Sequence, residues 1–194
     1  MTRLIFEIVF ILFFVVTGFI RRPFQKKNKA NTITMDQKDT PEKWLLGLTF
    51  LGMSILPLVY VLSPWLDFAN YELPLAFNIL GTLLLLPTAL LFYRSHKDLG
   101  RNWSVSLEIR EAHSRVTEGV YQYIRHPMYS AIWLWVICQT LLLQNYIAGF
   151  SGIVGFGLLY FFRVNKEEKM MEQEFGEQYT TYKQRTKRLI PNLF

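Results

Sequence analysis

The sequence predicts an all-α, polytopic membrane protein with about five transmembrane helices, the last two of which form a tight helical hairpin, and with a cytoplasmic C-terminal amphipathic helix. Three observations predict this fold class. Half of the 194 residues are hydrophobic, and they gather in long, nearly uncharged blocks. The Lys and Arg residues gather in the polar segments between these blocks. The last polar segment keeps a helical repeat of apolar and charged side chains.

The first apolar block covers residues 4–20 and is interrupted only by Glu7 and Gly18. It is followed by RRPFQKKNK, with no small-residue cleavage site, so we expect a spanning helix and not a signal peptide. Residues 28–41 are polar and show no apolar period, which predicts a loop or a surface helix. Pro41 fits the first turn of the helix that follows.

The second and third blocks each contain proline. Residues 44–62 form the second block, in which Pro57 predicts a kink. Residues 73–93 form the third, with Pro74 in its first turn and Pro87 near its far end. A proline inside a helix removes one backbone hydrogen bond, so we expect a bend at Pro87.

Two shorter apolar blocks follow, at residues 128–143 and 146–162, and only Gln144 and Asn145 separate them. At ~1.5 Å per residue, each block is slightly shorter than a ~30 Å hydrocarbon core. So short a connection predicts a tight helical hairpin, whose two open ends lie on the same face of the membrane.

The tail at residues 163–185 continues the last block with helical periodicity. We expect the fifth span to run out of the bilayer as an amphipathic helix, with a break or bend at Gly176. Side chains at steps of four share one face of this helix. They are Arg163, Glu167, Met171 and Phe175, joined by Tyr179 and Tyr182.

Basic residues assign the two faces of the membrane. The loop directly after the first block has five Lys or Arg, the segment from 94 to 126 has six, and the tail from 163 has seven. The connections at 63–72 and 144–145 have none. Because Lys and Arg are enriched on the cytoplasmic side, we expect the N-terminus outside and the basic segments in the cytoplasm.

Composition disfavours several kinds of site. Cys138 is the single cysteine, so we expect no disulfide framework and no thiolate metal site, only a small buried or lipid-facing hydrophobe. His96, His113 and His126 lack paired ligand spacing, which argues against zinc or iron. The net charge of +6 comes without a nucleic-acid motif. Glycine-rich nucleotide loops and nucleophile motifs do not occur in the sequence.

The segment GVYQYIRHPMY, residues 119–129, opens the candidate site. Pro127 biases His126 away from the α region, so RHP predicts a turn that aims Arg125 and His126 before the next helix starts. The tyrosines offer aromatic faces and hydroxyls to a ligand that is partly flat and partly charged. The same composition is also typical of an interfacial anchor that binds no ligand, and both interpretations stay open on composition alone.

Arg163 and Glu167 lie one turn apart at the mouth of the hairpin. If the tail folds back over the RHP turn, they face Tyr121, His126 and Tyr129 across a small polar chamber. Such a chamber matches a zwitterionic nucleoside such as S-adenosylmethionine, with a guanidinium for the carboxylate, a carboxylate for the ribose and aromatic faces for adenine and sulfonium. The alternative is an i,i+4 ion pair on a solvated helix, worth only a few tenths of a kcal/mol.

Three ordered motifs resemble a known family. They are SHKDLGRNWS at residues 95–104, HSRVTEGVYQYIRHPMY at 113–129 and FFRVNKEEKMMEQEFGEQYTTY at 161–182. Together they are similar to the isoprenylcysteine carboxyl methyltransferase family of membrane enzymes, especially its prokaryotic members. The resemblance covers about the last hundred residues and leaves the first two spans without a matching motif.

The resemblance implies a multispanning α-helical enzyme that uses S-adenosylmethionine. It divides the chain into three N-terminal transmembrane helices, residues 1–93, and a catalytic methyltransferase region, residues 94–194. It implies catalytic roles for Arg163 and Glu167, and Glu108 falls where some members place a further contact. The implied cofactor-binding residues are His113, Ser114, Arg115, Val116, Tyr121, His126, Pro127, Met128, Tyr129, Arg163 and Glu167.

The function that follows is methyl transfer to the carboxylate of an isoprenylcysteine-like acceptor at the membrane–cytosol interface, without metal or nucleic acid. Such a carboxylate, with a pKa of ~3.5, is already an anion at neutral pH and needs no general base. An alternative is a phospholipid or small-lipid amine methyltransferase, which needs a base such as Glu167, Glu168 or His126. A second alternative is a non-catalytic membrane scaffold that binds anionic lipids.

Overall fold

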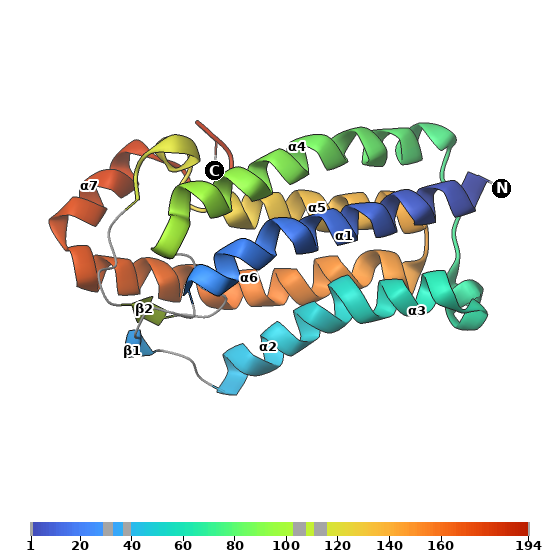
Figure 1. Ribbon diagram of the computed structural model, residues 1–194, viewed down its shortest axis with the longest axis horizontal. Helices are drawn as coiled ribbons and strands as arrows, with labels where there is room; N and C mark the ends of the chain where they lie inside the picture. Colours follow the sequence, from blue (N-terminus) through green and yellow to red (C-terminus); the bar gives the residue numbers. More distant parts are fainter. Residues whose placement is uncertain (1, 29–32, 37–39, 103–107, 111–115, 194) are drawn as a thin grey trace.

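The computed structural model describes residues 2–28, 33–36, 40–102, 108–110 and 116–193. Figure 1 shows long helices that run roughly along one axis of the molecule. In chain order, the elements are α1 (Thr2–Asn28), β1 (Ile33–Asp36), α2 (Thr40–Phe50), the π-helical turn η1 (Leu51–Ile55), α3 (Leu56–Leu62), the 3-10 helix η2 (Pro64–Ala69), α4 (Leu75–Leu99), η3 (Gly100–Asn102), β2 (Glu108–Arg110), the 3-10 helix η4 (Gly119–Gln122), α5 (Pro127–Leu143), α6 (Tyr146–Phe175) and α7 (Glu177–Arg185).

Four helical segments of the described chain are long and apolar enough to cross a membrane. They are Arg3–Gln25, Thr40–Leu62, Leu75–Leu99 and Tyr146–Phe175. The shorter apolar helix α5 packs against α4 and α6 and supplies the fifth apolar segment. The predicted all-α polytopic class with about five spans is therefore confirmed.

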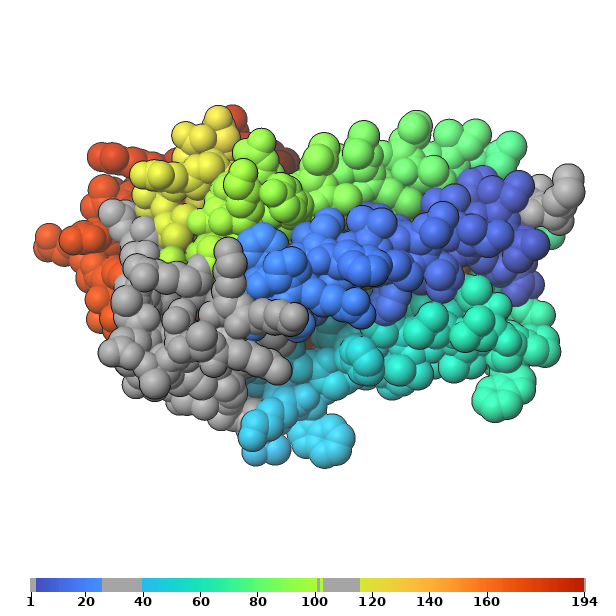
Figure 2. Space-filling view, in the orientation of Figure 1, coloured from blue at the N-terminus to red at the C-terminus, as the bar shows by residue number. Residues whose placement is uncertain are grey.

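The outer faces of the helices are strongly apolar. Figure 2 shows α1, α4 and the α2–α3 segment side by side on one face of the molecule. Many large apolar side chains there and on α6 are more than half exposed, among them Leu12, Phe19, Leu83, Leu86, Val154 and Phe161. A surface of this kind is a liability in water, whereas lipid tails solvate it well. The protein is a multi-pass integral membrane protein.

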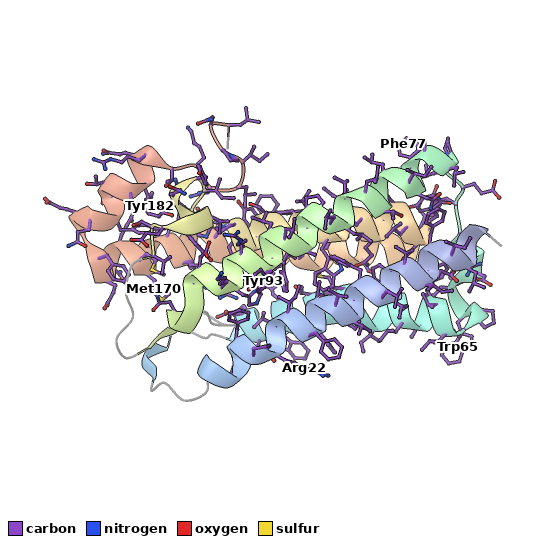
Figure 3. All side chains as sticks on the ribbon, turned by 45° about the horizontal axis from the view of Figure 1, so that its top comes forward. Arg22, Trp65, Phe77, Tyr93, Met170 and Tyr182 are labelled. Atoms are coloured by element: carbon purple, nitrogen blue, oxygen red, sulfur yellow. The ribbon has the colours of Figure 1, made fainter. Side chains whose placement is uncertain are left out.

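The two ends of the bundle differ in character. In Figure 1, η4, α7, β1 and β2 lie at one end, and the N-terminus lies at the other with the connection that follows α3. Figure 3 separates the same two ends by labelled side chains, with Tyr182 and Met170 near one end and Trp65 near the other. We call the end that carries η4 and α7 the polar end. The described parts of the predicted basic segments, which include η4 and α7, lie at this end.

The second span is interrupted by η1, a π-helical turn, just before Pro57. A π turn leaves backbone carbonyl groups to be satisfied by other partners. The carbonyl oxygen of Gly52 accepts hydrogen bonds from Gln139 Nε2 at 2.9 Å and from Ser151 Oγ at 2.7 Å. A π turn that docks on α5 and α6 thus precedes Pro57 in the second span.

The structures of the α5–α6 hairpin and of the tail agree with the predictions from the sequence. Gln144 adopts a left-handed conformation with φ of 45°, and the Asn145 side chain accepts hydrogen bonds from the first amides of α6. The tight hairpin of α5 and α6 is therefore confirmed. Gly176, with φ of +54°, separates α6 from α7, as the sequence predicts. Helix α4 begins one residue after Pro74 and continues through Pro87 to Leu99.

A small antiparallel sheet differs from the expectation for residues 28–41. Within this range, β1 pairs with β2, with Ile33 opposite Arg110 and Asp36 opposite Glu108. The prediction of a loop or surface helix is wrong at β1. Because the partner strand lies in the next polar segment of the chain, the local pattern of residues carries no sign of the pairing.

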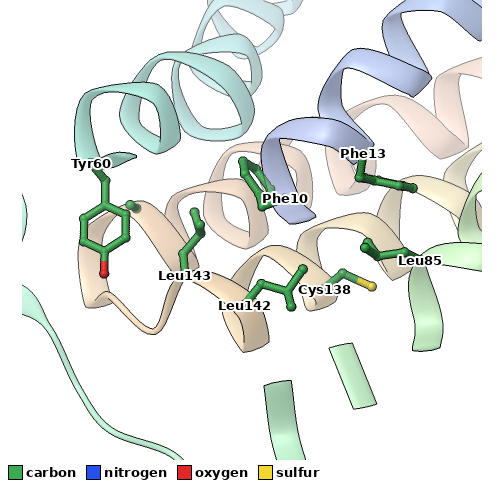
Figure 4. Packing of buried hydrophobic residues seen from close by; sticks show 8 residues of the cluster. Phe10, Phe13, Tyr60, Leu85, Cys138, Leu142 and Leu143 are labelled. Atoms are coloured by element: carbon green, nitrogen blue, oxygen red, sulfur yellow. The ribbon is translucent and has the colours of Figure 1, made fainter. Parts of the chain in front are cut away.

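The main apolar core lies where α1, α3, α4, α5 and α6 meet (Figure 4). Cys138 is fully buried in it, as expected for a small hydrophobe. The buried members of this core are Phe10, Phe13, Tyr60, Leu85, Cys138, Leu142, Leu143 and Ala148. A second cluster, around Tyr129, Phe156 and Tyr160, lies between α5 and α6. This cluster adjoins the polar end, because Tyr129 belongs to it and also contacts Glu167.

Candidate functional site

Helix α4 positions η4 through Asp98. The amide of Val120 donates to Asp98 Oδ2 at 2.9 Å, and Gly119 lies so close to this carboxylate that a Cβ atom would overlap it. Gly119 has φ of +60°, which suits glycine. The motif that contains Asp98 and the motif that contains Gly119 are therefore joined in the structure.

Tyr121 is buried between η4, α4 and α7. Its hydroxyl donates to the carbonyl of Ser95 at 3.3 Å, and its own carbonyl accepts a hydrogen bond from the Tyr182 hydroxyl at 2.5 Å. Burial, reinforced by the nearby Glu167 charge, raises the pKa of the Tyr121 phenol well above its ordinary value. The Tyr121 hydroxyl is therefore a neutral donor to α4, and the Tyr121 carbonyl accepts the hydrogen bond that ties the tail to η4.

The RHP triplet forms the predicted turn. His126 is the residue before α5, with φ of −123° and ψ of 58°, outside the α region, and Pro127 begins the helix. The turn aims both neighbouring side chains at Glu168, a target that the sequence did not indicate. Arg125 Nε lies 3.0 Å and His126 Nε2 lies 3.2 Å from Glu168 Oε1.

Glu168 is the centre of a charge cluster. It is 2% exposed, and besides Arg125 and His126 it contacts Arg188 through two atom pairs, at 3.1 and 2.8 Å. Lys183 Nζ adds an ion pair at 3.5 Å. A carboxylate with this many cationic partners stays ionised and is held in one orientation. The sequence suggested Glu168 only as a possible base.

Glu167 forms a second cluster on the adjacent side of α6. It accepts a hydrogen bond from the Tyr129 hydroxyl, and its Oε2 atom lies 3.8 Å from Arg163 Nε. The His126 ring stacks on the Tyr129 ring, with centroids 5.3 Å apart and planes at 17°, and its Nδ1 atom lies 3.9 Å from Glu167 Oε1. The structure therefore brings together four of the residues singled out in the sequence.

Arg163 also reaches a residue that sequence reasoning missed. Its Nη1 atom lies 3.6 Å from Oε1 of Glu42, near the start of α2, and the Glu42 side chain is fully buried. An acidic residue in the first turn of a helix is commonly explained by the helix dipole, so the local sequence gave no reason to link Glu42 to a site. The link exists only because α2 packs against α6.

Some of the remaining predicted site residues lie outside the described part of the chain, and the others lie within it. His113, Ser114 and Arg115 lie outside the described residues. Pro127 is buried at the start of α5, while Met128 and Val116 are half-buried. Glu108 lies in β2, the strand that pairs with β1.

The chemistry of the described cluster fits a charged nucleoside. Glu167, 23% exposed, is an acceptor for hydroxyl groups, Arg163 is a donor for a carboxylate, and the stacked rings of His126 and Tyr129 offer aromatic faces for a sulfonium. Within the described part of the chain, no group of three or more His, Cys, Asp or Glu side chains is arranged to hold a metal ion.

Comparison with known sequences identifies a match in the part of the chain that contains the cluster. Residues 79–173 match the model of the isoprenylcysteine carboxyl methyltransferase family. The protein-S-isoprenylcysteine O-methyltransferase B of Arabidopsis thaliana is 37% identical over 94 residues, which cover 47% of this chain and 48% of that protein. The protein-S-isoprenylcysteine O-methyltransferase of Homo sapiens is 29% identical over 162 residues, 79% of this chain and 57% of that protein. The chain spans about half the length of the curated relatives it matches.

A solved structure shares the fold. It is described as the eukaryotic intramembrane Ras methyltransferase, isoprenylcysteine carboxyl methyltransferase, without a monobody. The two superpose with a TM-score of 0.52 at 22% identity, over 80% of this chain and 54% of the other. The matched segment of the family model contains His126, Tyr129, Arg163 and Glu167. Residues 79–173 of the chain are therefore similar in sequence to the isoprenylcysteine carboxyl methyltransferase family, and the chain shares the fold of the solved structure.

Proposed function

We propose that the protein transfers a methyl group from S-adenosylmethionine to the carboxylate of a lipophilic, isoprenylcysteine-like acceptor at the membrane–cytosol interface. One observation carries the proposal. The Tyr129–Glu167–Arg163 cluster lies at the polar end of the bundle, inside the segment that matches the family model. The two curated relatives above are both named for O-methyl transfer to isoprenylcysteine.

The proposed roles follow the geometry of the cluster. Arg163 holds a carboxylate, of either the cofactor or the acceptor, and Glu167 accepts hydroxyl hydrogen bonds. Tyr129 fixes Glu167 by donating to it, and the stacked His126 ring fixes Tyr129. In this proposal, residues 94–194 form the catalytic region and residues 1–93 contribute the three N-terminal spans. Glu42 makes the first part of the chain a contributor to the site as well.

The chemical step makes small demands on the protein. When bound, S-adenosylmethionine supplies a methyl group on a sulfonium; a carboxylate oxygen takes the methyl carbon, an ester forms, and the sulfur leaves as a neutral thioether. The acceptor is ionised at neutral pH, so the chain needs no base for this step. The work of Arg163 and Glu167 is to orient the reacting groups, and the apolar cluster beneath them limits access of water.

Charge pairing at the site favours a carboxylate acceptor over an amine. Methylation of an ammonium acceptor needs a carboxylate or imidazole to remove its proton. Glu168 is bound by Arg125 and Arg188, and His126 contacts Glu168 through Nε2. Glu167 already accepts a hydrogen bond from Tyr129 and lies beside Arg163. Each candidate base is thus committed to a partner within the site.

In the same proposal, the polar end faces the cytosol and the N-terminus lies outside. The support is the distribution of Lys and Arg, which crowd the segments at the polar end. Arg185→Cys and Glu72→Cys test it, because both positions are exposed at opposite ends and Cys138 is buried. A membrane-impermeant maleimide applied to intact cells should label Glu72→Cys alone; labelling of Arg185→Cys alone reverses the orientation.

The first experiment on function is S-adenosylmethionine binding by calorimetry with the purified protein in detergent and in lipid. His126→Ala and Glu167→Ala should both weaken binding, while Glu174→Ala, an exposed carboxylate on the same helix, should not. Methyl transfer to a prenylcysteine and to phosphatidylethanolamine then distinguishes the acceptors. A folded parent protein that binds no S-adenosylmethionine would overturn the proposal and favour a lipid-binding scaffold.

A further inference from the structure

The segment after α7 pairs with the RHP turn. We call residues 186–189 the strap. Its carbonyl groups accept hydrogen bonds from the amides of Arg125, at 2.8 Å, and His126, at 3.0 Å, and from the hydroxyl of Ser130, at 2.7 Å. The Arg125 guanidinium also donates to a strap carbonyl. The strap therefore fixes the backbone just before α5 by hydrogen bonds. The strap itself lies C-terminal to residues 79–173, the segment that matches the family model.

The strap also delivers a side chain to the site. Arg188 donates from Nε and Nη2 to the two oxygens of Glu168, at 3.1 and 2.8 Å, and from Nη2 to Asn165 at 2.9 Å. The planar fork of a guanidinium matches the two oxygens of a carboxylate, so this contact fixes the plane of Glu168 as well as its position. Glu168 Oε1 is the atom that lies 3.2 Å from His126 Nε2.

We propose, on the basis of the proposed function, that Arg188 is a positioning residue of the methyl-transfer site. It fixes Glu168, Glu168 holds the His126 ring against Tyr129, and Tyr129 in turn donates to Glu167. Arg188 acts through these contacts and not by touching the substrate. The arrangement assigns the strap a role in forming the site, with its backbone holding the turn and its arginine holding the ring.

Arg188→Gln tests the assignment, with Arg185→Gln as the matched control. Arg185 is an exposed arginine three residues away, at the end of α7. We expect Arg188→Gln to raise the Kd for S-adenosylmethionine about tenfold, the loss typical of one hydrogen-bonded charge contact, and Arg185→Gln to leave it unchanged. Arg188→Lys keeps the charge without the fork and should fall between the two.

A double-mutant cycle separates positioning from general stability. Combined with His126→Gln, the Arg188→Gln substitution should add little further loss of affinity, because its effect passes through His126. Equal losses of affinity in the two backgrounds would overturn the proposal. The KM for a prenylcysteine acceptor should stay within about twofold of the parent value, since the strap does not reach that substrate in this scheme.

Histidine NMR tests the same contact without any ligand. In protein labelled with ¹⁵N-histidine, with the His126 signal identified by its loss in His126→Gln, Arg188→Gln should shift the His126 ring resonances and leave those of His96 in place. An unchanged His126 signal would refute the inference even if the protein binds S-adenosylmethionine. If Arg188→Gln does not fold, Arg188→Lys carries both measurements. Failure of the parent to bind, with the NMR shift intact, would instead count against the proposed function.

Discussion

Glu42 Oε1 and Arg163 Nη1 lie 3.6 Å apart, although one residue belongs to the second span and the other to the last. Both side chains are almost completely removed from solvent, at 0% and 9% exposure. Charged groups are costly to bury unless paired, and in membrane helices they usually mark functional sites. This ion pair therefore fixes the α2–α6 contact and the orientation of a proposed catalytic residue at the same time.

Glu42→Gln removes the negative charge with little change of shape. We expect the free energy of unfolding to fall by about 3 kcal/mol, because Arg163 stays buried without this partner. We also expect weaker S-adenosylmethionine binding, measured by calorimetry, since the guanidinium is no longer held. Glu72→Gln, at an exposed site near the other end of the bundle, is the control. Identical behaviour of the two variants would show that the ion pair is unimportant.

Tyr129→Phe removes the hydroxyl that donates to Glu167 and keeps the ring that stacks on His126. Glu167 is 23% exposed, so water replaces the lost donor and the stability cost should stay near ~1 kcal/mol. The affinity for S-adenosylmethionine should fall about tenfold because the carboxylate is no longer oriented. Tyr123→Phe, on a side chain that is 61% exposed, should change neither quantity. Unchanged affinity in Tyr129→Phe would exclude the proposed role of this hydroxyl.

Gly52→Ala tests the packing of the π turn. A Cβ atom at Gly52 would overlap the carbonyl of Ser151, whereas a Cβ atom at Gly47 meets nothing within 4 Å. We expect Gly52→Ala to lower the unfolding free energy by about 1–3 kcal/mol, since neither backbone can retreat. Gly47→Ala should be neutral or slightly stabilising, as alanine favours helix. Unfolding in mixed detergent would measure both variants, and equal stabilities would contradict the close contact.

Gly119→Ala tests the joint between η4 and α4. Gly119 and Gly100 both have positive φ, so alanine carries a backbone cost of about 1–2 kcal/mol at either position. Only at Gly119 does the added Cβ also overlap the Asp98 carboxylate. We therefore expect Gly119→Ala to lower the melting temperature more than Gly100→Ala, and to disturb Tyr121, which follows two residues later. Equal melting temperatures would show that Asp98 moves aside freely.

Local sequence was sufficient for features that depend on neighbouring residues. Gly176 ends α6 because glycine adopts positive φ easily, and Asn145 caps the helix that follows a two-residue connection. Pro127 places the start of α5 after the RHP turn. The i,i+4 spacing of Arg163 and Glu167 put both on one helix face, where the structure has them paired at 3.8 Å. The roles assigned to these residues remain predictions.

The sequence by itself determined that the chain is a helical membrane protein, because long, nearly uncharged apolar blocks match the length of a membrane-spanning helix, in which every backbone group is hydrogen-bonded within the segment. It also determined the hairpin, the amphipathic tail and most members of the Tyr129–Glu167 cluster. Only the tertiary structure decided that Glu42 meets Arg163, that β1 pairs with β2, and that Arg188 holds Glu168. Each of these contacts joins segments that are distant in the chain. Their geometry depends on how the helices pack, which no local pattern of residues encodes.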